Sequence, residues 1–168
     1  VLLIVFKPFR VGDSVQAGGS TGTVVEIQIF STLIRTDANA LIFVPNSAIT
    51  SATITNFSAE HQRRIDLVIK CGYDNDLRQV KAFLVELLAA DERVLQLPPP
   101  TVAVDQLGDN AVSLIVQPWV RSEYYGSVRT DLLEAIKVGF EQQGIRPGGA
   151  LKPAPPVADP TLRIARVA

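Results

Sequence analysis

Residues 23–30 read TVVEIQIF, and this stretch decides the fold of the first third of the chain. Its side chains alternate, with Val25, Ile27 and Ile29 on one face and a more polar set, ending in Phe30, on the other. A period of two is the pattern of a β-strand, since successive side chains point to opposite faces of a sheet. We therefore predict a strand over residues 23–30.

Further short strands surround this one. GGSTG at residues 18–22 predicts a tight turn before it. Runs of strand-forming residues follow at residues 31–36, 41–44 and 53–57. Many short strands in so little sequence favour a small, strongly bent sheet or barrel over residues 8–58.

Residues 59–146 follow a different pattern, in which helices alternate with strands. The predicted elements are a strand, a helix, two strands and a second helix, which begin at Arg64, Asp74, Thr101, Ala111 and Ser122. This order matches most of a ferredoxin-like split βαβ unit.

Each predicted helix carries one apolar stripe of helical period. The first opens at residues 74–76, whose short polar side chains can cap free backbone amides, and Gly144 caps the end of the second. The stripes consist of Leu77, Val80, Leu84, Leu87 and Leu88 in the first helix and of Val128, Leu132, Leu133, Ile136 and Phe140 in the second. We expect both stripes to be buried.

Both ends of the chain are distinctive. Residues 1–6 are entirely apolar and Lys7 follows, which leaves two interpretations, a buried strand or the cytosolic end of a truncated membrane helix. The chain contains no methionine, which favours a fragment of a longer protein. Residues 147–160 are rich in proline and predict a stiff, extended linker. Residues 161–168 look like a solitary strand that must pair elsewhere, with equivalent strands of other subunits as candidates.

Composition and spacing argue against several classes of protein. The formal net charge of -1 supplies no basic field for nucleic acid. No cysteine or carboxylate stands at ligand spacing around His61, the only histidine, so we expect neither a metal site nor a catalytic centre. The glycines of residues 18–22 fit neither dinucleotide-binding nor P-loop spacing. Cys71 ends an apolar run and is expected to be a buried thiol. We therefore predict no cofactor and no enzyme activity.

A collinear set of short motifs resembles the cytosolic region of the small-conductance mechanosensitive channel family. The set comprises FKPFRVGD at residues 6–13, GGSTGTV at 18–24, IFST at 29–32, VPNS at 44–47, ITNFS at 54–58, YDND at 73–76, LGD at 107–109, PWV at 118–120 and DLLEAIK at 131–137. Each motif is weak alone, and the common order over residues 6–146 makes the resemblance strong.

The resemblance implies an α+β fold in consecutive parts. These are the end of a pore-lining transmembrane helix (1–7), a small Sm-like β-barrel domain (8–58), a ferredoxin-like α/β domain (59–146), a proline-rich linker (147–160) and a C-terminal strand of an oligomeric β-barrel (161–168).

The resemblance also implies a function. The chain would be the cytosolic vestibule of a tension-gated channel of the inner (plasma) membrane, which releases ions and small osmolytes on hypo-osmotic shock. Subunits would assemble as a homo-oligomer, usually a heptamer, and N-terminal helices would contact the lipid bilayer. No nucleic acid partner is implied.

Four residues are candidates for the joint between the pore helix and the β domain: Lys7, Pro8, Arg10 and Phe30. Phe30 either belongs to the barrel core or, as the family implies, contacts the pore helix. Arg10 is either a solvated residue or a charge near the lipid headgroups.

Two further groups of charged residues are candidates for contact with permeating ions. Glu60, Arg63 and Arg64 lie where the family places its lateral portals, although a solvated hinge would carry the same residues. Arg163 and Arg166 would give the distal barrel a field that favours anions, or would protect a strand edge.

Two other functions share parts of this fold. Sm-like barrels and ferredoxin-like sheets both bind RNA, but the chain has few aromatic residues and no Lys/Arg-Gly-Phe run. Small hydrolases share the ferredoxin-like topology, but no phosphate loop with a flanking arginine is present. The channel vestibule is therefore the favoured hypothesis, with RNA binding as its alternative.

Overall fold

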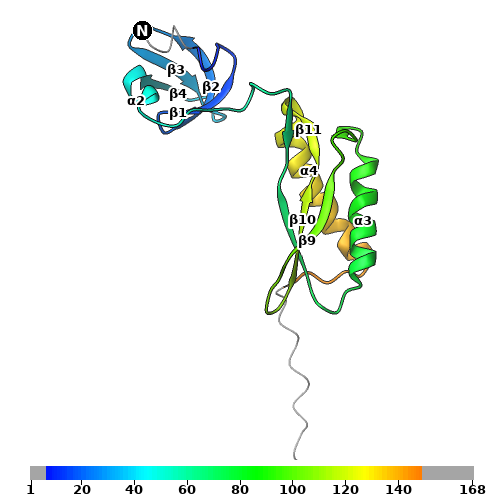
Figure 1. Ribbon diagram of the computed structural model, residues 1–168. Helices are drawn as coiled ribbons and strands as arrows, with labels where there is room; N and C mark the ends of the chain where they lie inside the picture. Colours follow the sequence, from blue (N-terminus) through cyan, green and yellow to red (C-terminus); the bar gives the residue numbers. More distant parts are fainter. Residues whose placement is uncertain (1–6, 149–168) are drawn as a thin grey trace, which may run out of the picture.

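The computed structural model describes residues 7–148, which form a β unit followed by an α/β unit (Figure 1). The predicted α+β fold is confirmed, with the small β unit first and the ferredoxin-like unit second. The terminal strand predicted over residues 161–168, all of the predicted linker beyond residue 148, and the apolar residues 1–6 lie outside the described residues.

The β unit is one bent antiparallel sheet with a single short helix. Its elements are β1 (Ser14–Ala17), β2 (Ser20–Ile27), β3 (Ser31–Arg35), β4 (Leu41–Pro45), α2 (Asn46–Thr50) and β5 (Thr55–Asn56). The strand order is β4-β3-β2-β1-β5, so every strand but β5 pairs with its neighbour in the chain. The sheet wraps around a small apolar core that includes Val15, Ile34 and Ile49.

The predicted faces of residues 23–30 are wrong, and a β-bulge is the reason. The register between β2 and β3 shifts between Val24 and Glu26, which reverses the alternation. Val24 is 1% exposed and Ile27 also packs on the core, whereas Ile29 is 61% exposed. The strand ends at Ile27, so Phe30 lies in the following turn rather than in a strand.

The α/β unit contains two three-stranded sheets and two long helices. Its elements are β6 (Gln62–Arg64), β7 (Leu67–Cys71), α3 (Leu77–Ala90), β8 (Val94–Leu95), β9 (Thr101–Leu107), β10 (Val112–Gln117), β11 (Trp119–Arg121), the 3-10 helix η1 (Ser122–Tyr124) and α4 (Tyr125–Gln142). The sheet orders are β7-β10-β9 and β6-β11-β8.

Two strands that the sequence predicts as continuous are each divided between these sheets. The strand from Arg64 breaks into β6 and β7, and the strand from Ala111 breaks into β10 and β11. Pro118 stands at the second break and lacks the N–H that a ladder needs. The amide of Ile65 donates to the carbonyl oxygen of Pro118 at 2.9 Å, so both strands turn at the same level.

Both helices bury their apolar stripes against one face of the β7-β10-β9 sheet. The predicted stripes are confirmed except at Leu133, which is 39% exposed. Each residue of a helix is rotated by about 100° from the one before it, so Leu133 points away from the core that its neighbour Leu132 faces. Asp76 caps α3 by accepting a hydrogen bond from the amide of Arg78 at 2.8 Å. Gly144 has a φ of +68° just after α4, in agreement with the predicted cap.

The segment after α4 covers part of the free edge of β7, where a ferredoxin-like unit has its fourth strand. Cys71 pairs with Pro147 as an isolated bridge, and the amide of Gly148 donates to the Lys70 carbonyl oxygen at 3.0 Å. Asn75 holds this segment in place, because its amide group both donates to the Arg146 carbonyl oxygen and accepts from the Arg146 amide.

An ion-pair cluster joins the end of α3 to α4. Arg93 donates from its backbone amide and its guanidinium to the carboxylate of Asp91 at 2.8–3.0 Å. The same guanidinium reaches Asp131 on α4 at 2.8 Å. These bonds hold the pKa of Asp91 below its usual value, and the side-chain hydrogen bond from Arg93 is the main cause.

We expect Asp91→Asn to lower the free energy of unfolding at neutral pH by about 1–2 kcal/mol, because charge-assisted hydrogen bonds are lost. The folded pKa of Asp91 is lowered, so its ionised form stabilises the fold above the ordinary value of 3.8. That stabilisation disappears as the pH falls through the folded pKa. Urea unfolding at neutral pH and at about pH 2 should therefore show a deficit that shrinks in acid.

Asp105→Asn is the matched control, since Asp105 is exposed on β9. It should change the free energy of unfolding by less than about 0.5 kcal/mol. An Asp91→Asn deficit of equal size at both pH values would contradict the role assigned to the charge.

Candidate functional site

The N-terminal segment of the β unit, residues 7–13, is a turn locked onto the sheet. The side chain of Phe9 is buried in the core of the unit, whereas Lys7, Pro8 and Arg10 are exposed. The carboxylate of Asp13 accepts from the backbone amide of Arg10 at 2.9 Å and from the side chain of Asn56 at 2.8 Å. The segment is therefore tied both to itself and to β5.

Gly12 allows the backbone to reverse direction in this turn. Its φ of +97° lies in a region that favours glycine, and its amide donates to the carbonyl oxygen of Val24 at 2.8 Å. The first strand begins two residues later, at Ser14.

The turn between β2 and β3 projects an apolar side chain into solvent. Phe30 is 84% exposed, so the interpretation that places it in the barrel core is wrong. An exposed phenylalanine on a short turn is a candidate contact for another element of the assembled protein.

Asn46 holds this turn in shape. Its side-chain amide donates to the carbonyl oxygens of Gln28 and Ile29 at 2.9 and 3.1 Å, and its side-chain oxygen accepts from the Thr32 hydroxyl at 2.8 Å. Its backbone amide donates to the carbonyl oxygen of Phe30. Sequence reasoning identified Asn46 only as part of a turn motif. A polar residue directly after an apolar strand is the signal that could have pointed to this role.

The connector between the units, residues 57–61, is hydrogen-bonded to both of them. On the β side, the amide of Phe57 donates to the carbonyl oxygen of Ser14 at 2.9 Å, and the amide of Ser14 donates to the Ser58 hydroxyl at 3.0 Å. On the α/β side, Ser122 donates through its amide to the His61 carbonyl oxygen and through its hydroxyl to the Glu60 carbonyl oxygen. The connector is thus held over most of its length.

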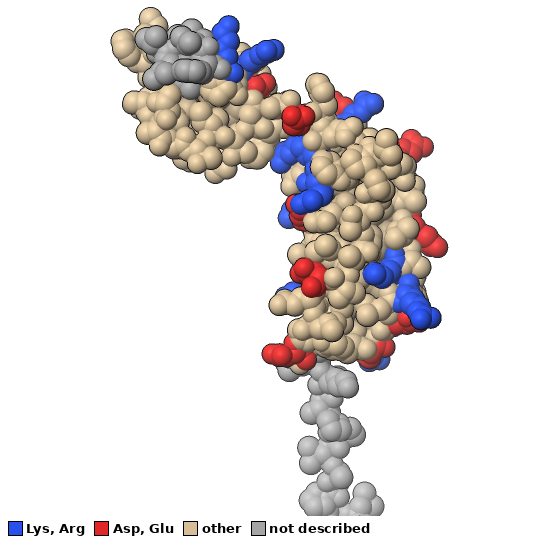
Figure 2. All heavy atoms as spheres, viewed as in Figure 1, with Lys and Arg blue, Asp and Glu red and all other residues tan. Residues whose placement is uncertain are grey.

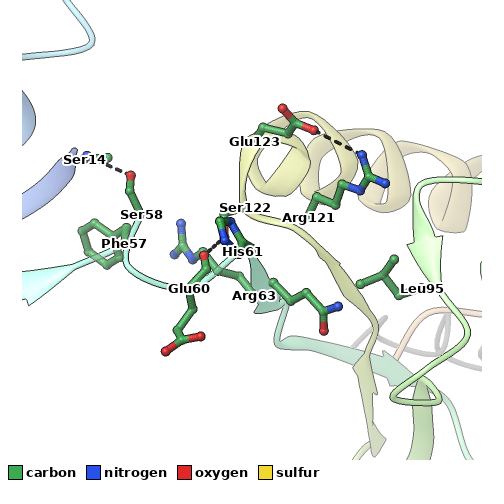
Figure 3. A pocket seen from close by; sticks show the side chains of 11 residues that line it. Ser14, Phe57, Ser58, Glu60, His61, Arg63, Leu95, Arg121, Ser122 and Glu123 are labelled. Atoms are coloured by element: carbon green, nitrogen blue, oxygen red, sulfur yellow. Dashed lines mark hydrogen bonds and ion pairs between the residues drawn. The ribbon is translucent and has the colours of Figure 1, made fainter. Parts of the chain in front are cut away.

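An open cavity of about 720 Å³ lies at this connector (Figure 3). Its walls come from both units and consist of Ser14, Phe57, Ser58, Glu60, His61, Gln62, Arg63, Leu95, Arg121, Ser122 and Glu123. Figure 2 shows basic and acidic side chains close together where the two units meet. The cavity is therefore a mixed-charge site rather than a purely cationic or anionic one.

The structure brings together two of the three predicted portal residues. Glu60 and Arg63 both line the cavity. Arg64 does not line the cavity, and its guanidinium bonds to Asp66 at 2.8 Å. The distal candidates Arg163 and Arg166 lie outside the described residues.

Arg63 makes a contact that the sequence did not predict. Its guanidinium lies 4.7 Å from the centre of the Phe57 ring and 3.7 Å from the centre of the Tyr125 ring. Both distances are typical of cation–π contacts. One ring belongs to the connector and the other to α4, so Arg63 stacks between parts of the chain that are distant in sequence.

The described residues also bear on metal binding, on thiol chemistry and on membrane crossing. Within residues 7–148, no group of three or more histidine, cysteine or acidic side chains could hold a metal ion. Cys71 is buried as predicted, and burial, followed by the charge of Asp74, raises the pKa of its thiol. No helix within the described part of the chain is long and apolar enough to cross a membrane.

A β unit of this strand order, followed in one chain by a ferredoxin-like unit, defines the class of protein. Residues 1–59 match the family model described as the mechanosensitive ion channel β-domain. Residues 65–146 match the model described as the MscS mechanosensitive ion channel C-terminal region. The chain belongs to the MscS family of mechanosensitive ion channels, as its motifs predicted. This is a family of channels and not a class of enzymes.

Two curated relatives show how far the similarity extends. The chain is 39% identical to the small-conductance mechanosensitive channel of Edwardsiella ictaluri over 145 residues, which are 86% of this chain and 51% of that protein. It is also 39% identical to an MscS family protein of Synechocystis, again over 86% of this chain and 49% of that protein. The chain thus spans about half the length of these relatives.

Solved structures agree with this assignment. The closed-state structure of Helicobacter pylori MscS superposes with a TM-score of 0.82 at 26% identity, covering 92% of this chain and 62% of that one. Arabidopsis thaliana MSL1 superposes with a TM-score of 0.70 at 20% identity over 89% of this chain and 56% of that one, which supports the fold.

Proposed function

We propose that this chain is the cytosolic vestibule of a tension-gated ion channel that releases ions and small osmolytes on hypo-osmotic shock. The observation that carries the proposal is the presence of both family units, in order, in one chain. The same match favours the channel over RNA binding. The complete protein lies in the inner (plasma) membrane with this region in the cytoplasm, and it assembles as a homoheptamer.

The joint to the pore helix consists of two parts of the β unit. Lys7, Pro8 and Arg10 form the exposed side of the N-terminal turn, and the buried Phe9 anchors that turn in the core. Phe30 offers an exposed apolar surface on a turn that Asn46 fixes. A rigid turn with an apolar tip can transmit a displacement of the pore helix to the sheet.

Charged residues near the connector face the permeating ions. Glu60 and Arg63 line the open cavity between the units, and Arg64 lies beside them on β6. Charges of either sign along a pathway alter which ions enter it.

The decisive experiment reconstitutes the complete gene product in liposomes and records current from patches under suction. We expect current that opens with tension and closes when tension is released. A protein that inserts into the liposomes but passes no tension-gated current would overturn the proposal. Sedimentation of the purified protein as a strict monomer would contradict the heptamer.

We expect Phe30→Ala to change gating without changing stability. Phe30 is 84% exposed, so its truncation should alter the free energy of unfolding by less than about 0.5 kcal/mol. In the complete channel, loss of its contact should raise the tension required for opening, as measured by patch recording. Phe43→Ala is the matched control, because Phe43 is also exposed but lies on β4. If Phe30→Ala left the opening tension unchanged, Phe30 would not be part of the joint to the pore helix.

A further inference from the structure

The two units have separate apolar cores. The buried apolar side chains of the β unit lie within residues 9–49, and those of the α/β unit lie within residues 65–145. In the part of the chain that the structure describes, no hydrogen bond or ion pair joins residues 7–56 directly to residues 62–148. Two folded units without a large shared apolar interface move relative to each other by default. Their orientation therefore depends on the connector and on what holds it.

The connector is anchored to one unit at each end and is free between the two anchors. Residues 57–58 are hydrogen-bonded to Ser14 of the β unit, whereas the carbonyl oxygens of residues 60–61 accept from Ser122 of the α/β unit. Ala59 lies between these anchors and makes no hydrogen bond within the described residues. The open cavity of about 720 Å³ at the connector leaves room for movement. Ala59 is therefore the hinge at which the backbone can turn.

The side chain of Arg63 spans this hinge. Its base is fixed in the α/β unit, because Arg63 pairs with Val120 in the ladder between β6 and β11 and its guanidinium lies 3.7 Å from the centre of the Tyr125 ring. Across the hinge, the same guanidinium lies 4.7 Å from the centre of the Phe57 ring. The amide of Phe57 is in turn hydrogen-bonded to β1. The guanidinium thus links a residue anchored on the β unit to the body of the α/β unit.

The two rings are the contacts that orient the guanidinium. Within residues 7–148, no side-chain hydrogen bond or ion pair engages Arg63, and Figure 3 shows the carboxylate of Glu60 turned away from it. A cation over the face of an aromatic ring is attracted by the ring's quadrupole. Removal of the cation or of the Phe57 ring would therefore remove the link across the hinge.

We propose that Arg63 is the clasp of this hinge, and that its contact with Phe57 holds the β unit and the α/β unit in one orientation. Without this contact, the backbone turns at Ala59 and the angle between the units spreads over a broad range. The inference goes beyond the proposed function, because it concerns how the two units are held and not what passes through the channel. It is measured without current, so its failure leaves the channel proposal standing.

The test is double electron–electron resonance on the 168-residue chain, with spin labels at Ser47→Cys in α2 and Glu134→Cys in α4. Both positions are exposed and Cys71 is buried, so the labels attach to the introduced thiols. Labelled chain is diluted into an excess of unlabelled chain, so that the recorded distances lie within one chain. We expect one narrow distance distribution with Arg63 in place and loss of the narrow peak in Arg63→Gln. An equally narrow peak in Arg63→Gln would overturn the proposal.

Matched variants separate the ring contact from charge and bulk. Arg64→Gln removes the same charge from the neighbouring residue and should keep the narrow peak. Phe57→Tyr retains an aromatic ring and should also keep the peak, whereas Phe57→Leu retains apolar bulk without a ring and should lose it. Circular dichroism of each variant checks that the helix content is unchanged, so that a broad distribution reports movement at the hinge.

The Phe57 variants keep the proposal falsifiable if Arg63→Gln fails to fold. A narrow peak in Phe57→Leu, or a peak in Arg64→Gln or Phe57→Tyr as broad as in Phe57→Leu, would refute the role assigned to Arg63.

Discussion

Gly22→Ala is expected to destabilise the β unit by about 3 kcal/mol, because the new methyl group has no room. Gly22 is buried in β2, where it pairs with Val15 of β1. A Cβ at this position would lie 2.2 Å from the carbonyl oxygen of Arg35 and 2.9 Å from the side chain of Ile34. The nearest atom belongs to the backbone of β3, so relief requires that the ladder between β2 and β3 open.

The measurement is urea unfolding followed by circular dichroism, with Gly126→Ala as the control. Gly126 lies in α4, and a Cβ there would meet no heavy atom within 4 Å. The same chemical change should therefore stabilise the chain by up to about 1 kcal/mol, since alanine favours helices more than glycine does. A Gly22→Ala chain as stable as the wild type would show that the sheet is not packed as described.

The sequence predicted which helices and strands form better than it predicted which faces of the strands are buried. Val80 and Leu84 belong to a stripe of helical period, and such a stripe is buried against whatever sheet packs on the helix. The burial of these side chains was therefore predictable from the pattern alone. The faces of β2 were not, because one extra residue at the bulge near Val25 reverses every position that follows. The break at Pro118 had a local signal, since proline cannot donate to a ladder.

The candidate site was predictable in part for a similar reason. Glu60 stands on the connector and Arg63 in the strand β6 that follows it, where the order of motifs located them. The stacking of Arg63 on Tyr125 joins residues 62 positions apart, and no local pattern carries that information. Contacts of this kind depend on how distant segments of the chain pack together, which is seen only in the folded structure.

Asn46→Ala is expected to lower the free energy of unfolding by about 3 kcal/mol, because it leaves several polar groups without partners. Asn46 is 8% exposed, and its side chain supplies two donors and one acceptor to the turn between β2 and β3. The Thr32 hydroxyl, which is fully buried, would lose its bond to the Asn46 side-chain oxygen, and the carbonyl oxygens of Gln28 and Ile29 would lose their donor. Urea unfolding of the chain measures this loss.

Ser47→Ala is the matched control, because Ser47 is the exposed neighbour of Asn46 in α2 and makes no side-chain bond within the described residues. It should unfold like the wild type. In the complete channel, Asn46→Ala should also raise the opening tension in the same direction as Phe30→Ala, since a loosened turn no longer holds Phe30 in place. The two variants differ in one respect: only Asn46→Ala should lose stability. If the Asn46→Ala chain were stable and the channel gated normally, the Asn46 hydrogen bonds would have no role in the joint to the pore helix.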